Sequence, residues 1–162
     1  MKLAAKMVAG SDNRVVVGLG ATGLSCARYL YKRGLSFTVV DTRMQPPGLA
    51  ALRREMPDVV VFAGEYPAEL VASASALIVR PGIAMDAPIV TQALDAGVEV
   101  LGDIDLFMRE AGAPVVGITG SNAKSTVTEL LGQMARYAQL NVGVGGNLGT
   151  PALDLLAEDR DL

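Results

Sequence analysis

A glycine-rich turn between an apolar run and a helical segment constrains the fold of this chain most. Residues 14–17 are Arg-Val-Val-Val, residues 18–23 read GLGATG, and residues 24–33 have the pattern of a helix. The apolar run shows no polar alternation, which indicates a parallel strand buried on both faces. The chain therefore begins as the strand, turn and helix of an α/β sheet.

The turn has the spacing of a phosphate-binding loop. In the pattern G-x-G-x-x-G, Gly18 allows a tight turn, Gly20 lets a phosphate approach the backbone, and Gly23 lets helix and strand pack closely. The start of the helix offers an anion free N–H groups and a positive dipole end. Asp41 closes the next strand, where an acid usually binds a ribose hydroxyl. These residues predict a nucleotide or nucleotide-sugar site; the alternative is a glycine turn that serves packing only.

Strands and helices alternate along the first two thirds of the chain. We expect strands at 14–17, 37–41, 59–62, 76–79 and 98–101, and helices at 24–33, 46–56, 68–72, 86–96 and 103–111. In this interpretation Pro46 and Pro47 open one helix, Asp86 caps another, and Gly34 and Gly97 stop two of them. The alternation is typical of an α/β fold with a Rossmann-like, doubly wound parallel sheet. We expect an N-terminal tail at 1–13 and this domain at 14–112.

A second apolar run, residues 114–119, leads into the sequence TGSNAKST at 119–126 and a helix expected at 124–138. This turn is similar to a phosphate loop, in which Lys124 would reach the phosphates and the Ser125 hydroxyl would bind magnesium. Ala123 stands where the loop pattern has glycine. It would cost roughly 1–2 kcal/mol if left-handed and little if its φ were negative. The alternative is an ordinary helix start with a surface lysine.

The remaining residues predict a strand at 141–144, a glycine-rich turn at 145–149 and a helix from Pro151. Two strands are fewer than a stable sheet usually has. Residues 113–162 are therefore expected to form an incomplete unit, which either adds to the first sheet or is the front part of a longer protein.

Composition excludes several kinds of chemistry. The chain has no histidine, so it holds no Ser-His-Asp system and no histidine-ligated metal. Its single cysteine, Cys26, excludes an internal disulfide, fits a reducing compartment, and is expected to be a small core residue. Asp103 and Asp105 flank a helix start, where carboxylates suit the helix dipole better than acid–base catalysis.

Charge and hydropathy exclude two kinds of partner. A net charge of −3 and 4% aromatic residues argue against nucleic-acid binding. No stretch is long and apolar enough to span a membrane, and Lys6 interrupts the short apolar set of residues 1–10, so we expect no signal peptide. The chain is therefore expected to be cytoplasmic.

Several linked motifs resemble the Mur ligase family, and within it the D-glutamate-adding ligases (MurD). The matching segments are residues 18–25, 40–43 and 81–83, then 102–107, 118–128 and 143–149. They cover nearly the whole chain from Arg14 onward, in the family's order. The resemblance implies a UDP-binding Rossmann-like domain at 14–112 and the first part of a P-loop ATPase domain at 113–162, from an enzyme of peptidoglycan and cell-wall synthesis.

The resemblance also implies a reaction, in which ATP phosphorylates the carboxylate of UDP-MurNAc-L-alanine and D-glutamate then attacks the acyl phosphate. ATP and Mg²⁺ are the implied cofactors. The implied substrate-binding residues are Gly18, Gly20, Ala21, Thr22, Gly23, Asp41, Thr42, Arg43, Pro81, Gly82 and Asn147. The implied ATP-binding residues are Gly120, Ser121, Asn122, Ala123, Lys124, Ser125 and Thr126, with Ser125 also a magnesium ligand.

Two positions depart from the family pattern. Arg80 stands where the family usually has serine before Pro-Gly, and Ala123 replaces the usual glycine. The family's metal-binding Glu and His and its glutamate domain are not expected in these residues, so we expect binding without turnover. Two alternatives remain: an NAD-binding oxidoreductase domain, which suits Asp41 but leaves Lys124 unexplained, and a non-catalytic nucleotide-sensing module.

Overall fold

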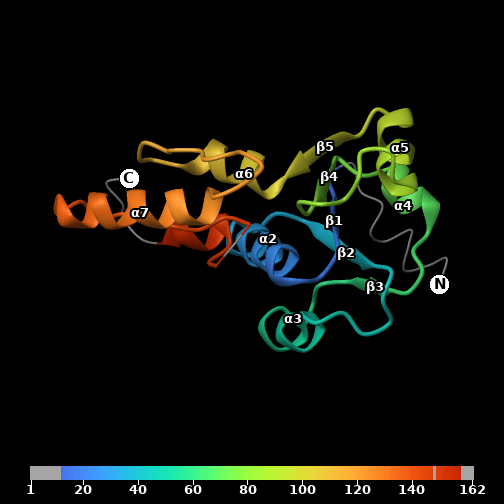
Figure 1. Ribbon diagram of the computed structural model, residues 1–162. Helices are drawn as coiled ribbons and strands as arrows, with labels where there is room; N and C mark the ends of the chain where they lie inside the picture. The colour runs from blue at the N-terminus through green and yellow to red at the C-terminus, as the bar shows by residue number, and fades with distance from the viewer. Residues whose placement is uncertain (1–11, 148, 158–162) are drawn as a thin grey trace. The chain divides into compact units, whose positions relative to one another are not determined.

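The computed structural model describes residues 12–147 and 149–157, and the chain divides into two compact units, Met1–Asp103 and Ile104–Leu162. The first unit contains a parallel sheet with the strand order β3-β2-β1-β4-β5 (Figure 1). Its strands are β1 (Arg14–Val17), β2 (Phe37–Asp41), β3 (Val61–Ala63), β4 (Ala76–Val79) and β5 (Glu99–Gly102). Because the sheet grows from β1 in both directions, the doubly wound α/β fold is confirmed.

The helices of this unit differ from expectation at their starts. They are α2 (Ala21–Lys32), α3 (Leu49–Glu55), α4 (Ala68–Ala72) and α5 (Pro88–Asp95), and α6 (Asp103–Glu110) begins at the division. The prediction that Asp86 caps α5 is wrong, because Ala87 is the cap residue and Pro88, with its preset φ, begins the helix. The prediction that Pro46 and Pro47 open α3 is also wrong, since Gly48 is the cap residue of that helix.

Both faces of the sheet are covered, as the unbroken apolar strands predict. Side chains alternate between faces, so Val15, Val40 and Leu77 join the core formed with α4 and α5. Val16 and Ile78 point the other way and line a narrow gap with Cys26 of α2. Figure 1 shows α4 and α5 on the opposite side of the sheet from α2. Cys26 is buried, as expected.

The second unit contains α7 (Lys124–Tyr137) and a 3₁₀ helix, η1 (Ala152–Ala157). The expected strands at 114–119 and 141–144 are wrong, since no strand forms among the described residues of this unit. A parallel strand needs a hydrogen-bonded neighbour, and no such partner strand is available among those residues, so Val115 and Val116 stay about half exposed. The helix expected from Pro151 is the 3₁₀ helix η1.

An apolar stripe on α7 is also uncovered. Val127, Leu130, Met134 and Tyr137 follow one another at helical spacing, and each is about half exposed or more. The other side of α7 is packed, because a Cβ on Gly132 would lie 2.6 Å from Val144 Cγ2. Within the described part of the chain, no helix is long and apolar enough to cross a membrane.

The expected domain limits stay a prediction. The compact units divide after Asp103, whereas the limits of 14–112 and 113–162 would place all of α6 with the sheet. The expected tail at 1–13 lies outside the described residues except for its last two, and of these Asn13 is buried.

Candidate functional site

Three loops meet at the carboxyl edge of the sheet, at the ends of β1, β2 and β4. Val17 of β1 is paired with Val40 on one side and Val79 on the other. The residues just beyond these pairs, Gly18, Asp41 and Arg80, therefore stand side by side. This is the point where the sheet changes its direction of growth, the usual position of a ligand crevice in open α/β sheets.

The glycine loop has the geometry that its spacing predicts. Gly18 has φ +88°, and its N–H donates to the Val40 carbonyl oxygen at 2.7 Å. A Cβ on Gly23 would lie 1.9 Å from the Gly18 carbonyl oxygen, so only glycine fits there. Gly20 caps α2 with extended backbone, nothing lies within 4 Å of its would-be Cβ, and no side chain caps the helix. The first amides of α2 are thus open to an anion.

The Asp41 carboxylate accepts four hydrogen bonds at this edge of the sheet. Its Oδ1 accepts from the Arg43 N–H and Nε at 2.9 Å each, and its Oδ2 accepts from the Leu19 N–H at 2.7 Å and an Arg43 terminal nitrogen at 2.6 Å. The Arg43 guanidinium, helped by the two backbone N–H groups, lowers the pKa of Asp41 to about 2, although burial opposes this shift. A carboxylate has about four acceptor positions, and all are used.

Two residues that organise this edge were missed from the sequence. Leu19, fully buried, donates its N–H to Asp41, and its carbonyl oxygen accepts from the Gly48 N–H at 2.9 Å. A Cβ on Gly48 would stand 3.0 Å from that oxygen. The segment before α3 is therefore hydrogen-bonded to the glycine loop through Gly48. The Pro-Pro-Gly sequence was the available signal.

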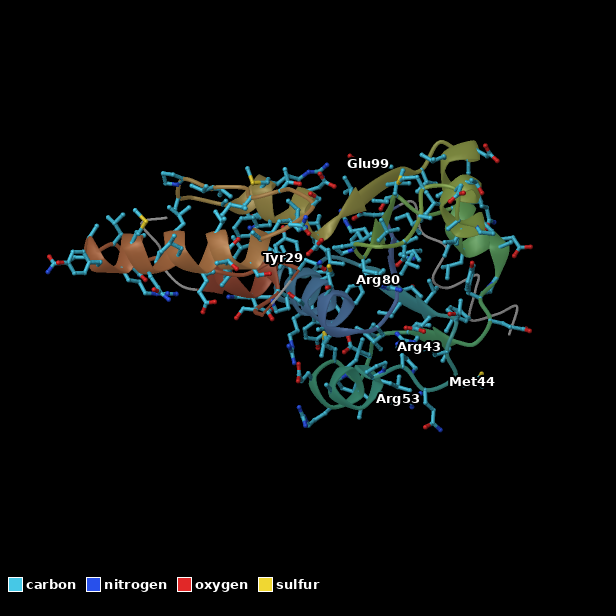
Figure 2. The ribbon with its side chains drawn as sticks, viewed as in Figure 1. Tyr29, Arg43, Met44, Arg53, Arg80 and Glu99 are labelled. Atoms are coloured by element: carbon cyan, nitrogen blue, oxygen red, sulfur yellow. The ribbon has the colours of Figure 1, made fainter. Side chains whose placement is uncertain are left out.

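Arg80 covers the neighbouring side of the glycine loop. A Cβ on Gly18 would lie 3.4 Å from Arg80 Cδ and 3.5 Å from its Nε. One terminal nitrogen of Arg80 donates to the Pro81 carbonyl oxygen at 3.4 Å, and Gly82 takes φ +89°. Pro81, Gly82 and Thr42 are exposed. In Figure 2 the labelled side chains of Arg43 and Arg80 follow β2 and β4, the two strands that flank β1.

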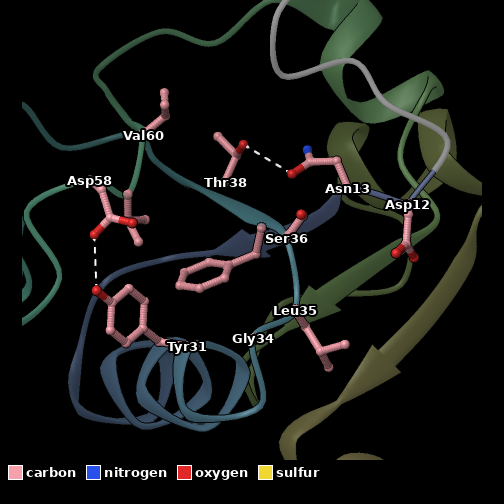
Figure 3. Close-up of a pocket in the computed structure, with 11 residues that line it drawn as sticks. Asp12, Asn13, Tyr31, Gly34, Leu35, Ser36, Thr38, Asp58 and Val60 are labelled. Carbon is pink, nitrogen blue, oxygen red and sulfur yellow. Dashed lines mark hydrogen bonds between the residues drawn. The ribbon is translucent and has the colours of Figure 1, made fainter.

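A wider cavity, of about 590 Å³, lies at the opposite edge of the sheet, where β1 and β2 begin (Figure 3). The Tyr31 hydroxyl donates to Asp58 at 3.1 Å there, and this bond raises the pKa of Tyr31. The Thr38 hydroxyl donates to Asn13 Oδ1 at 3.4 Å. None of the predicted site residues lines this cavity, and it is at the amino ends of the strands, the wrong edge for the usual ligand crevice.

The predicted phosphate loop lies in the second unit and is exposed along residues 120–126. Ala123 has φ 59° and ψ 8°, Gly120 has φ 149°, and the Lys124 ammonium donates to the Gly120 carbonyl oxygen. A left-handed residue next to helical backbone turns successive N–H groups toward one point, which suits a phosphate. Asn147 is in the same unit and exposed.

These residues fit the phosphates of ATP. Open amides begin α7 without a side-chain cap, and Lys124 is the adjacent cation. For magnesium the fit is limited to the Ser125 hydroxyl, since among the described residues no group of three or more His, Cys, Asp or Glu could hold a metal ion.

Replacing Ala123 with glycine is expected to stabilise the second unit. The left-handed conformation costs an L-residue roughly 1–2 kcal/mol, and glycine removes that cost but is more flexible when unfolded, so we expect a net gain of about 1 kcal/mol. Amide hydrogen exchange of α7 measures the gain locally. Ala135→Gly, in the helix interior, should do the opposite and lower protection. No gain for Ala123→Gly would contradict the left-handed assignment.

Comparison with known proteins gives both a family and a set of relatives. Residues 12–102 match the family described as Mur ligase MurD-like, N-terminal domain. The UDP-N-acetylmuramoylalanine–D-glutamate ligase of Pseudomonas aeruginosa is 58% identical over 156 residues, which are 96% of this chain and 35% of that protein. The enzyme of the same name from Marinobacter nauticus is 52% identical over 153 residues, 94% of this chain and 34% of that protein.

A solved structure is similar as well. It is a pseudomurein peptide ligase type C from Methanothermus fervidus, with a TM-score of 0.56 and 25% identity. The match covers 90% of this chain and 30% of that one. The chain spans about a third of the length of the curated relatives it matches.

Proposed function

The chain belongs to the Mur ligase family through its MurD-like N-terminal domain, and from this premise we propose that it is the nucleotide-binding part of a ligase that adds D-glutamate to UDP-MurNAc-L-alanine. The observation that carries the proposal is the meeting of the glycine loop, Asp41 and Arg80 at the carboxyl edge of the sheet. It occurs in a chain that matches such a ligase over 96% of its residues.

We propose that the diphosphate of the UDP-sugar binds at the loop of Gly18, Gly20 and Gly23 and at the first amides of α2, those of Ala21 and Thr22. The uridine would lie along Thr42, Arg43, Pro81 and Gly82. For the sugar–peptide part the family resemblance implies Asn147, which stays a prediction. Asp41 would act mainly by holding Leu19 and Arg43 in place, since its acceptor positions are already occupied.

The hydrogen bonds that already occupy the acceptor positions of Asp41 also argue against the NAD-binding alternative. An acid that recognises a ribose accepts hydrogen bonds from its hydroxyl groups. Here the ribose would first have to displace Arg43 or the Leu19 N–H from a carboxylate that is only 3% exposed. The geometry favours a ligand that leaves Asp41 in place.

We propose that Lys124, Ser125 and Thr126, with the backbone of Gly120–Ala123, hold ATP phosphates. ATP supplies the phosphoryl group that activates the substrate carboxylate, and Mg²⁺ offsets its charge. Lys124 would leave the Gly120 carbonyl oxygen for a phosphate, and the Ser125 hydroxyl would face the metal. We expect binding without ligase turnover from this chain alone, because phosphoryl transfer also needs metal carboxylates and a positioned nucleophile.

A thermal-shift panel tests the nucleotide assignment. We expect UDP-MurNAc-L-alanine and UDP to raise the unfolding temperature, since a ligand at 100 times its dissociation constant adds ~2.7 kcal/mol. NAD should leave it unchanged. ATP with magnesium should stabilise the second unit, and Lys124→Ala should remove that effect without altering the response to UDP. Stabilisation by NAD and not by the UDP-sugar would favour an oxidoreductase domain instead.

A chimaera separates the ligase from a nucleotide-sensing module. The chain would replace the matching segment of the Pseudomonas aeruginosa relative, and phosphate release would be measured with UDP-MurNAc-L-alanine, D-glutamate, ATP and magnesium. We expect turnover that Lys124→Ala abolishes. UDP binding with no turnover in a folded chimaera would support the sensing module.

A further inference from the structure

We infer that Arg80 is a specificity-determining residue whose guanidinium binds the diphosphate of the nucleotide, and this inference rests on the proposed function. Arg80 lies beside the glycine loop. Arg80 directly follows Val79, which is paired with Val17, so its side chain starts next to the glycine loop. The side chain then crosses Gly18, with Cδ and Nε within van der Waals distance of where a Cβ would be.

The two arginines at this edge, Arg43 and Arg80, differ in their partners. Arg43 is already engaged, because it shares three side-chain and backbone hydrogen bonds with the Asp41 carboxylate. Arg80 has no carboxylate within ion-pair distance among the described residues, and its hydrogen bond to the Pro81 carbonyl oxygen is long, at 3.4 Å. Asp41 therefore neutralises Arg43, whereas Arg80 is a positive charge beside the glycine loop with no carboxylate partner among the described residues.

A guanidinium group binds a phosphate more strongly than it binds a nucleobase. Its planar fork can donate two parallel hydrogen bonds to a phosphate, and such charge-assisted pairs are about twice as strong as neutral ones. A nucleobase has no charge to offer it. The open amides of Ala21 and Thr22 begin α2 directly after Gly20, in the same loop that Arg80 crosses at Gly18. Arg80 and these amides therefore approach one ligand from the ends of adjacent strands.

Titration of the chain with uridine, UMP and UDP by calorimetry tests the inference. For Arg80→Ser we expect UDP affinity to fall about tenfold or more, while uridine affinity changes less than twofold. Arg80→Lys keeps the charge but loses the fork, so its UDP affinity should fall between the two. Arg53→Ser removes an exposed arginine from α3 and controls for net charge; it should bind all three ligands like the parent chain.

The outcomes separate the inference from the proposed function. An equal loss of uridine and UDP affinity in Arg80→Ser would assign Arg80 to the uridine end and overturn a diphosphate role. Unchanged UDP affinity would also overturn it while leaving the nucleotide site intact. Failure of the parent chain to bind UDP would overturn the proposed function itself. Because Arg80 is exposed, its variants are expected to fold, and their unfolding temperatures without ligand should match the parent's.

Discussion

Gly23→Ala is expected to destabilise the first unit by about 2–3 kcal/mol, even though alanine is the better helix former. The gain in helix propensity is about 0.5–1 kcal/mol. Against it stands a methyl group 1.9 Å from the Gly18 carbonyl oxygen and 2.9 Å from its carbon. Backbone must shift to admit it; overpacking typically costs about 1–3 kcal/mol, and a contact this short with backbone atoms places the cost at or slightly above the upper end of that range. The cost of the clash therefore exceeds the gain in helix propensity, and the unfolding temperature should fall by roughly 10–20 °C.

Gly20→Ala is the matched control in the same loop. Nothing lies within 4 Å of its would-be Cβ, and its φ of −90° is open to any residue. Its stability should fall by less than about 1 kcal/mol, since alanine caps a helix less well than glycine. UDP affinity should fall, because the methyl group would stand where a phosphate approaches. Equal stability losses in the two variants would contradict the packing role assigned to Gly23.

The strands of the first unit and the glycine turn were predictable because both rest on local patterns. Unbroken apolar runs indicate buried parallel strands. The spacing of Gly18 and Gly23 is that of the turn between a strand and the helix that follows it. Helix starts were less predictable. The residue that precedes α3, Gly48, is hydrogen-bonded to Leu19, a contact between residues far apart in the sequence that no local pattern shows.

The second unit shows a different limit of sequence patterns. The apolar runs at 114–119 and 141–144 have the composition of strands, but a strand also needs a neighbour to complete its hydrogen bonds. Among the described residues of this unit no such neighbour exists. Local patterns predict the tendency of a segment, and tertiary pairing decides whether it is realised.

The candidate site was predictable as a location more than as a set of contacts. The glycine loop and Asp41 were found from their spacing, and they meet at one edge. That Asp41 would be saturated by Leu19 and Arg43 was not predictable, because it depends on side-chain geometry. The same holds for Arg80, whose position over Gly18 follows from strand register.

Asp41→Asn is expected to lower the free energy of unfolding by about 2–3 kcal/mol at pH 7. The variant keeps the shape of the side chain but loses its charge, and its amide places donors against the Leu19 N–H and the Arg43 guanidinium. The buried Leu19 N–H would lose its acceptor, which costs about 1–3 kcal/mol, and the half-exposed Arg43 guanidinium would lose its ion pair. Urea unfolding of both proteins measures the difference.

The pH dependence of that difference tests its electrostatic origin. The folded state holds the pKa of Asp41 at about 2, below its ordinary value of 3.8, so the unfolded chain takes up the proton first as the pH falls. The stability that Asp41 contributes is therefore complete above about pH 4 and is lost between about pH 4 and pH 2. Glu55, whose pKa Arg28 also lowers to about 2, titrates in the same range, so Glu55→Gln is the control. The advantage of the parent chain over Asp41→Asn should shrink across this range in either Glu55 background. A difference that stayed constant from about pH 7 to about pH 2.5 would show that shape and not charge makes Asp41 the anchor of the glycine loop.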